Sequence, residues 1–159
     1  MNFNDVCAIW NNERLPIING IINSDGYIDN IHIDFDENNN CQRILVKGGR
    51  CRIESFFLEK ASIGFTNILI YDEITNHEKN IKIYCGGGGY GGEGFIVAES
   101  IDLGVKWIAY FEESNEFLRC EINGNTIIAY NNCNEKWTFD IDIPSNLIFD
   151  DSQKIGHRP

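Results

Sequence analysis

Alternation of apolar and polar residues is the pattern that most limits what this chain folds into. In "NIHIDF", Ile31, Ile33 and Phe35 alternate with polar residues, as in a strand with one buried face. Similar runs recur along the chain, separated by residues typical of turns. The further predicted strands are "QRILV" (42–46), "RCRIESFFLE" (50–59), "TNILIYDEI" (66–74), "NIKIYC" (80–85), "GFIVAES" (94–100), "VKWIAYFEE" (105–113), "FLRCEI" (117–122) and "TIIAY" (126–130).

Turn signals between these runs favour antiparallel hairpins. "NSDG" (23–26) separates "IINGII" from "YI", and Asn123-Gly124 lies between "FLRCEI" and "TIIAY". Asn-Gly between alternating apolar runs is a strong short-range hairpin signal, because both residues tolerate positive φ. We therefore expect a tight turn there.

The closing run "KWTFDIDIP" predicts one more strand, ended by Pro144 because proline donates no ladder hydrogen bond. Asp140 and Asp142 are expected on its outward face. Its inward residues are predicted to be Trp137, Phe139, Ile141 and Ile143.

Helix signals are few. "NDVCAIWNNERL" (4–15) predicts one short helix, with Asn4 or Asp5 as N-cap. "SNLIFDD" (145–151) is compatible with one further helical turn. The helix face expected to be buried consists of Val6, Ile9 and Trp10.

These elements predict a mainly β fold, with α+β as the alternative. We expect an antiparallel β-sandwich or open barrel of about nine strands and one short N-terminal helix. The 159 residues fit a single domain over 1–150, followed by a polar tail at 151–159.

The charge balance narrows the classes of partner. A formal charge of −11, from 24 acidic and 13 basic residues, repels nucleic acid and anionic lipid and attracts basic proteins. The alternative reading is an acidic surface that only maintains solubility. The first residues show no secretion signal, so we expect a cytoplasmic protein whose six cysteines are reduced and mostly buried.

"CGGGGYGGEGF" (85–95) is the densest glycine run, which could form a phosphate-binding loop or a flexible loop between two strands. A phosphate-binding loop needs a Lys and a following helix. This run has neither, and its charged residue Glu93 would repel phosphate. We therefore predict a loop between two strands, in which Tyr90 is displayed as a contact for a partner or, alternatively, folds back on the sheet.

No catalytic or metal-binding motif emerges, so we expect neither an enzyme nor a cofactor. The three histidines have no partner at zinc spacing. "DFDENNN" (34–40) resembles the opening of a calcium loop but has Asn39 and Leu45 where Gly and Glu are required. A carboxylate pair such as Glu112 and Glu113 could in principle serve a hydrolase, the last of our hypotheses.

Acidic residues gather near the predicted strand ends, often beside aromatic residues. If the fold brings these ends together, they form a negative surface with aromatic anchors, which suits docking on a basic protein. The predicted partner-binding residues are Tyr90, Glu93, Glu112, Glu113 and Asn115, followed by Asp72 and Glu73.

Two segments, "YGGEGFIVAESIDLGVKWIAYFEESNEF" and "NGNTIIAYNNCNEKWTFDIDIP", resemble small bacterial immunity proteins of polymorphic toxin and contact-dependent growth inhibition systems. The matching features are the glycine-rich turn into "GEGFIVA", the "WIAYF" strand with "SNEF", and "WTFDIDIP". The resemblance implies a cytosolic, non-enzymatic protein that binds and blocks a toxin domain, with basic nucleases as a common target. A β-sandwich carbohydrate-binding module, with exposed Trp or Tyr stacking on sugars, is the alternative.

Overall fold

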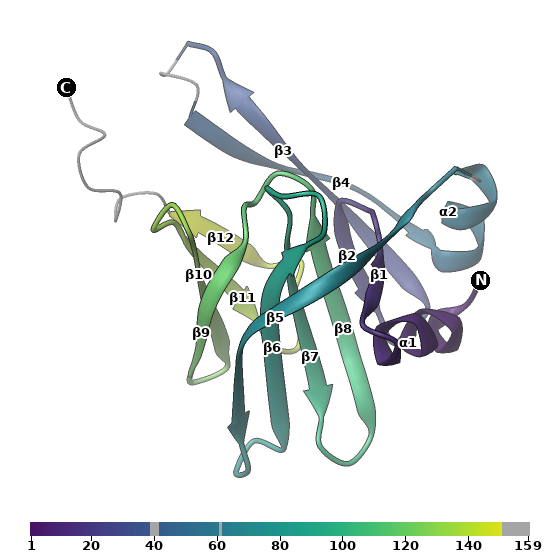
Figure 1. Ribbon diagram of the computed structural model, residues 1–159, viewed down its shortest axis with the longest axis vertical. Helices are drawn as coiled ribbons and strands as arrows, with labels where there is room; N and C mark the ends of the chain where they lie inside the picture. Colours follow the sequence, from purple (N-terminus) through teal and green to yellow (C-terminus); the bar gives the residue numbers. More distant parts are fainter. Residues whose placement is uncertain (39–41, 61, 151–159) are drawn as a thin grey trace.

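The computed structural model describes residues 1–38, 42–60 and 62–150. Over these residues the protein is mainly β, with twelve strands in two antiparallel sheets and two short helices. Figure 1 shows the smaller sheet on one side of the molecule and both helices on the other. The predicted mainly β, antiparallel sandwich class is confirmed, with more strands than the expected nine and a second helix.

The larger sheet has eight strands, and neighbours in the sheet often follow one another in sequence. The runs β5 to β8 and β2 to β4 are each sequential, and among the described strands the two long-range pairings are β1 with β5 and β8 with β2. In spatial order the strands are β1 (Arg14–Pro16), β5 (Phe65–Asn76), β6 (Ile81–Gly88), β7 (Gly94–Ser100), β8 (Gly104–Phe111), β2 (Gly20–Asn23), β3 (Tyr27–Asp36) and β4 (Gln42–Arg52).

The smaller sheet consists of four strands. The predicted hairpin joins two of them, with Gly124 at φ 61° and Asn123 paired with Thr126. In spatial order the strands are β12 (Leu147–Asp150), β11 (Lys136–Asp140), β10 (Thr126–Asn131) and β9 (Phe117–Asn123).

Strand β11 ends four residues before Pro144, earlier than predicted. The Asp140 carboxylate accepts hydrogen bonds from the backbone N–H groups of Asp142 and Ile143, both at 2.8 Å. This local turn competes with the sheet ladder and stops the strand. Ile141 is buried as predicted, but Ile143 is 54% exposed, so the prediction that its side chain points inward is wrong.

Alternation along the larger sheet produces two cores, one on each face. Ile96 faces the smaller sheet, whereas Phe95 and Val97 face the helices. An aromatic group fills the space between the sheets, where Trp137 contacts Phe111 with ring centroids 5.3 Å apart. Burying a side chain of this size contributes roughly 1.5–3 kcal/mol, so both faces hold the large sheet in place.

Helix α1 (Phe3–Asn11) covers the outer face of the larger sheet with Val6 and Trp10. Its N-cap is Asn2 rather than the predicted Asn4 or Asp5. The Asn2 side chain accepts from the Asp5 N–H at 3.0 Å, and the Asp5 carboxylate accepts from the Asn2 N–H at 2.8 Å. This reciprocal capping box satisfies two donors of the first turn.

Residues 53–59 form helix α2 (Ile53–Glu59), so the strand predicted over 50–59 is correct only as far as Arg52. Ile53 and Phe56 are buried three residues apart, and Phe57 is packed against the same core. This i, i+3, i+4 spacing is helical. The high content of β-formers in "RIESFFLE" obscured it.

The helical turn predicted over 145–151 is also wrong in its described part, because Leu147–Asp150 forms β12 at the edge of the smaller sheet. Residues 151–159 lie outside the described residues. Each of the described cysteines is a free thiol, and Cys85 and Cys120 are buried. Neither described helix is long and apolar enough to cross a membrane.

Candidate functional site

An acidic pocket lies where strand β2 begins. β2 separates β8 from β3 in the sheet, but it starts only at Gly20, which pairs with Tyr110 on one side and Asn30 on the other. Beyond that point β8 ends at Phe111 and is followed by Glu112, while β3 runs on past Asp34, and no described strand lies between them. The residues lining this acidic pocket are Asn19, His32, Ile33, Asp34, Glu112 and Glu113.

Asn19 fixes Glu112 at the rim of the acidic pocket. The Asn19 side-chain amide donates to the Glu112 carboxylate at 2.7 Å, and the Glu112 backbone N–H donates to the Asn19 side-chain oxygen at 2.9 Å. A reciprocal pair of this kind holds a carboxylate in one orientation, which lowers the entropy lost when it binds a cation.

Arg43 ties the β3–β4 hairpin to the turn that carries Glu113. Its guanidinium donates to the backbone oxygen of Glu113 at 2.7 Å and pairs with the buried Glu135 carboxylate at 3.2 Å. The positive charge of Arg43 is therefore paired with the carboxylate of Glu135, and Arg43 contacts only the backbone oxygen of Glu113. The arrangement leaves the Glu113 side chain directed at solvent.

The acidic pocket concentrates negative charge in a small volume. Asp34, Glu112 and Glu113 are exposed, and neither Lys nor Arg is among its described lining residues. Its volume is about 160 Å³. Pockets for drug-sized ligands hold roughly 300–1,000 Å³, so this one matches a single side chain better than a small molecule. A Lys or Arg side chain of a partner is the group that fits both size and charge.

Glu93 was predicted as a surface contact, but the structure places it inside the protein. Its side chain is 5% exposed, and its carboxylate accepts a hydrogen bond from the hydroxyl of the fully buried Tyr110. Burial, and then the Glu93 carboxylate, raise the pKa of Tyr110 well above its ordinary value. Glu93 is therefore not available as a surface charge.

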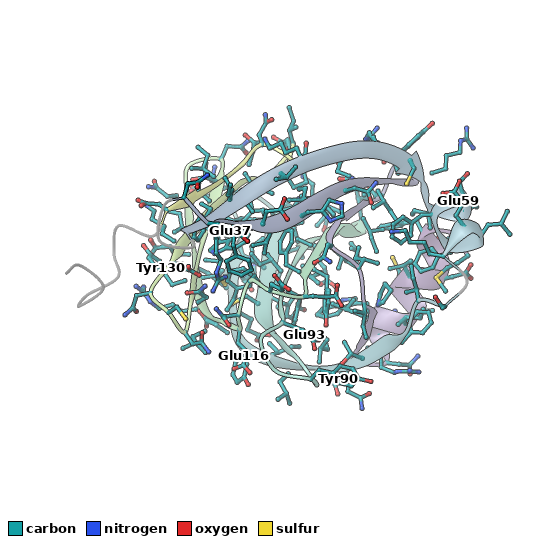
Figure 2. The ribbon with its side chains drawn as sticks, turned by 90° about the horizontal axis from the view of Figure 1, so that it is seen from above. Glu37, Glu59, Tyr90, Glu93, Glu116 and Tyr130 are labelled. Atoms are coloured by element: carbon teal, nitrogen blue, oxygen red, sulfur yellow. The ribbon has the colours of Figure 1, made fainter. Side chains whose placement is uncertain are left out.

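Tyr90 lies on the opposite side of the same loop, exposed to solvent. Its side chain is 76% exposed, and Figure 2 shows it at the margin of the molecule with Glu93 further in. It borders a hollow of about 190 Å³ that Arg14 and Phe65 also line. This hollow shares no lining residue with the acidic pocket.

Asn115 shapes the turn beside the acidic pocket. It adopts a φ of 64°, and its backbone N–H donates to the oxygen of Gly92 at 2.8 Å. Its half-buried side-chain amide contacts the Cys133 sulfur at 3.4 Å. Asn is among the few residue types that tolerate this conformation, so Asn115 positions the turn that follows Glu112 and Glu113.

Asp72 and Glu73 lie on β5, away from the lining of the acidic pocket. Asp72 is half-buried and turns toward Cys85 and Cys120, whereas Glu73 is exposed and lies 3.9 Å from Lys82. The seven predicted residues are thus divided among separate places. The structure brings Glu112 and Glu113 together in one pocket, with Asn115 in the adjoining turn.

A larger hollow of about 450 Å³ lies at the other end of β2, beside Asn23 and Trp107. Its charged groups pair with one another: Arg50 lies 2.7 Å from Asp25 and 3.1 Å from Asp29. Lys106 similarly pairs with Asp142 at 3.3 Å. Its charges are therefore largely satisfied within the protein, unlike those of the acidic pocket.

Sequence reasoning missed the three other polar members of the acidic pocket, namely Asn19, His32 and Asp34. His32 and Asp34 do stand on the polar side of the alternating "NIHIDF" run, which was the available signal. Their proximity to Glu112 depends on β2 pairing with β8, a long-range contact with no local signature. Comparison with protein-family models, with curated proteins and with solved structures finds no match to this chain.

Proposed function

We propose that this protein is an immunity protein that neutralises a basic toxin domain by binding it through the acidic pocket. The observation that carries the proposal is the presence of Asp34, Glu112 and Glu113 around one side-chain-sized pocket, with no Lys or Arg among its described lining residues. The overall charge of −11 and the resemblance to immunity proteins support the same conclusion.

The acidic pocket receives one Lys or Arg side chain of the toxin. Glu112 is already held by Asn19, so its carboxylate pays little conformational entropy on binding. Glu113 and Asp34 add negative potential that speeds the encounter with a basic partner. A nuclease presents such basic groups where it holds its polyanionic substrate, and their capture blocks the substrate.

Tyr90 supplies a second, aromatic contact from the neighbouring loop, which is tied to the turn after Glu113 by the hydrogen bond from the Asn115 N–H to the Gly92 oxygen. Exposed Tyr side chains are enriched among residues that dominate binding energy, because they bury a large rigid area. Glu93 has no direct role here, since its buried carboxylate is bonded to Tyr110. Asn115 acts indirectly by holding the turn, and Glu73 is a peripheral surface charge.

The alternative, a carbohydrate-binding module, is less well supported. Such a module stacks sugars on exposed aromatic rings, most often Trp. The three tryptophans are 6% exposed or less. Tyr90 and Tyr71 are exposed, but they do not lie in a described pocket of ligand size.

The direct test is co-expression with the C-terminal domain of a large secreted protein encoded beside this chain. We expect the chain to restore growth of cells that produce the domain and to co-purify with it. The matched comparison is Glu112→Lys with Glu113→Lys, which should reduce both effects. The proposal is refuted if the wild-type chain neither protects the cells nor co-purifies with the domain.

A further inference from the structure

Three side chains with metal-binding atoms meet between the two sheets. Asp72 comes from β5, Cys85 from β6 and Cys120 from β9, and their ligand atoms all lie within 4.8 Å of one another. Cys85 is fully buried and Cys120 is 8% exposed. We propose that these residues bind a zinc ion that joins the two sheets of the sandwich.

A β-bulge directs Asp72 into this group. Ile70 pairs with Gly86 and Asp72 pairs with Cys85, so Tyr71 is an extra residue in β5. In a regular ladder without the bulge, Tyr71 would pair with Cys85 and Asp72 would pair with Tyr84, which packs on the helix side of the sheet. The bulge therefore moves the carboxylate to the face that Cys85 occupies. Bulges are a frequent means of re-aiming a side chain at a site.

Two backbone hydrogen bonds orient the Asp72 carboxylate. One oxygen accepts from the Cys120 N–H at 2.9 Å, and the other accepts from the Glu73 N–H at 3.0 Å. An ionised carboxylate has about four acceptor positions, so each oxygen keeps capacity for a metal. Hydrogen bonds that hold a ligand in this way are typical of metal centres. They also place Asp72 directly against β9, in the second sheet.

The chemistry of the three ligands favours zinc over calcium or magnesium. Thiolates bind Zn²⁺ strongly, whereas Ca²⁺ and Mg²⁺ prefer oxygen ligands only. Two sulfurs bound to one tetrahedral Zn²⁺ at about 2.3 Å lie about 3.8 Å apart, which the observed grouping reaches with small movements. Each thiol loses its proton to solvent on binding. Because Asp72 is half-buried, water can complete the tetrahedron from its side.

The location gives the ion a structural role. β5 and β6 belong to the larger sheet and β9 to the smaller one, and Figure 1 shows β9 beside both of them. An ion held by all three strands would link the two sheets at a point where they already meet through apolar packing and the Cys120–Asp72 hydrogen bond. This inference is independent of the proposed function, because the group is distinct from the acidic pocket.

The test is a Co²⁺ titration of the reduced, chelator-treated protein. We expect one equivalent to bind, with a thiolate-to-cobalt charge-transfer band and the intense visible bands of a tetrahedral site. Zn²⁺ should abolish these bands by displacing Co²⁺ and should raise the midpoint of thermal unfolding. A wild-type protein that shows no such bands, and no shift with Zn²⁺, overturns the proposal without any variant being needed.

Variants locate the site. Cys85→Ser and Cys120→Ser should each abolish the charge-transfer band. Asp72→Asn replaces a charged ligand by a neutral one and should weaken binding by at least the roughly tenfold that loss of an outer-shell partner costs. Cys133→Ser is the matched control, because that half-buried thiol lies outside the group, and it should leave the titration unchanged. Bands that persist in folded Cys85→Ser and Cys120→Ser proteins would place the metal elsewhere and overturn the assignment.

Discussion

Glu93 illustrates how burial changes the role of a single residue. In the sequence it is the charged residue of a glycine run, and a surface position was the natural expectation. In the structure its carboxylate turns inward to the Tyr110 hydroxyl, whereas the side chain of Tyr90 in the same loop is exposed. Gly88 makes this possible, because a Cβ there would overlap the Glu93 carboxylate and approach the Tyr110 hydroxyl. The residue thus stabilises the loop that displays Tyr90.

Replacing Tyr110 tests this role. Tyr110→Phe removes the hydroxyl that donates to a buried carboxylate, and we expect the free energy of unfolding to fall by about 2 kcal/mol. The control is Tyr130→Phe, which removes a more exposed bond to Glu121 at 3.2 Å and should cost less than about 0.5 kcal/mol. Urea unfolding measures both. Equal losses in the two variants would contradict the special role of the buried pair.

The same pair predicts a dependence on alkaline pH. Burial and the neighbouring Glu93 raise the pKa of Tyr110 in the folded protein, whereas an unfolded Tyr titrates near a pKa of about 10. The folded state therefore keeps a proton that the unfolded state loses, and this stabilisation declines as pH rises above about 10. The stability difference between wild type and Tyr110→Phe should shrink by about 1.4 kcal/mol per pH unit there. A difference that stays constant would refute the shift.

At the scale of elements, the glycine run proves to be mostly strand. Gly86, Gly87 and Gly88 complete β6 and are buried, and positive φ occurs only at Gly91 and Gly92, with values of 80° and 78°. Close approach by neighbours explains the strand glycines. A Cβ at Gly86 would overlap the Leu69 carbonyl oxygen, and one at Gly87 would lie 2.6 Å from Glu116. The run is a tightly packed segment more than a flexible one.

Alanine substitution distinguishes a packed glycine from an open one. Gly86→Ala should lower the free energy of unfolding by about 3 kcal/mol, since a backbone atom of β5 must move. Gly49→Ala in β4 is the matched control, because no atom lies within 4 Å of its added Cβ. It should change stability by no more than about 0.5 kcal/mol. A Gly86→Ala protein as stable as wild type would show that the strand contacts are not tight.

The sequence predicted elements where local signals agree. Strands with a clear run of apolar residues, such as Gly94–Ser100, and the hairpin at Asn123 were identified correctly, because both depend on neighbouring residues. Residues 53–59 were not, because β-forming residues obscured a short helical spacing, and residues 147–150 were not, because four residues are too few to show a period and pairing with β11 decided their structure. The bulge at Tyr71 was equally invisible, because it is a property of the pairing with β6.

At the scale of the whole molecule, pairing between distant strands builds the candidate sites. The sequence predicted Glu112 and Glu113 as partner contacts, and they line one pocket. Asp34 lies beside them only because β2 begins at Gly20 and so leaves the space between the ends of β8 and β3 open. The group of Asp72, Cys85 and Cys120 likewise combines residues of three strands, so no sequence spacing could reveal it.

The central claim is that the acidic pocket receives a basic toxin domain. The measurement that tests it most directly is the association rate constant between the chain and the toxin domain that it protects against, at several salt concentrations. Glu113→Lys should slow association by about tenfold at low salt and flatten the salt dependence.

The control for that measurement is Glu78→Lys, an equal change of charge in the β5–β6 turn. That turn and the β8–β9 turn that carries Glu113 lie at opposite ends of the sheet in Figure 1. Glu78→Lys should alter the rate by less than about twofold. Equal slowing by both variants would mean that only net charge matters, and an unchanged rate for Glu113→Lys would exclude the acidic pocket from the interface.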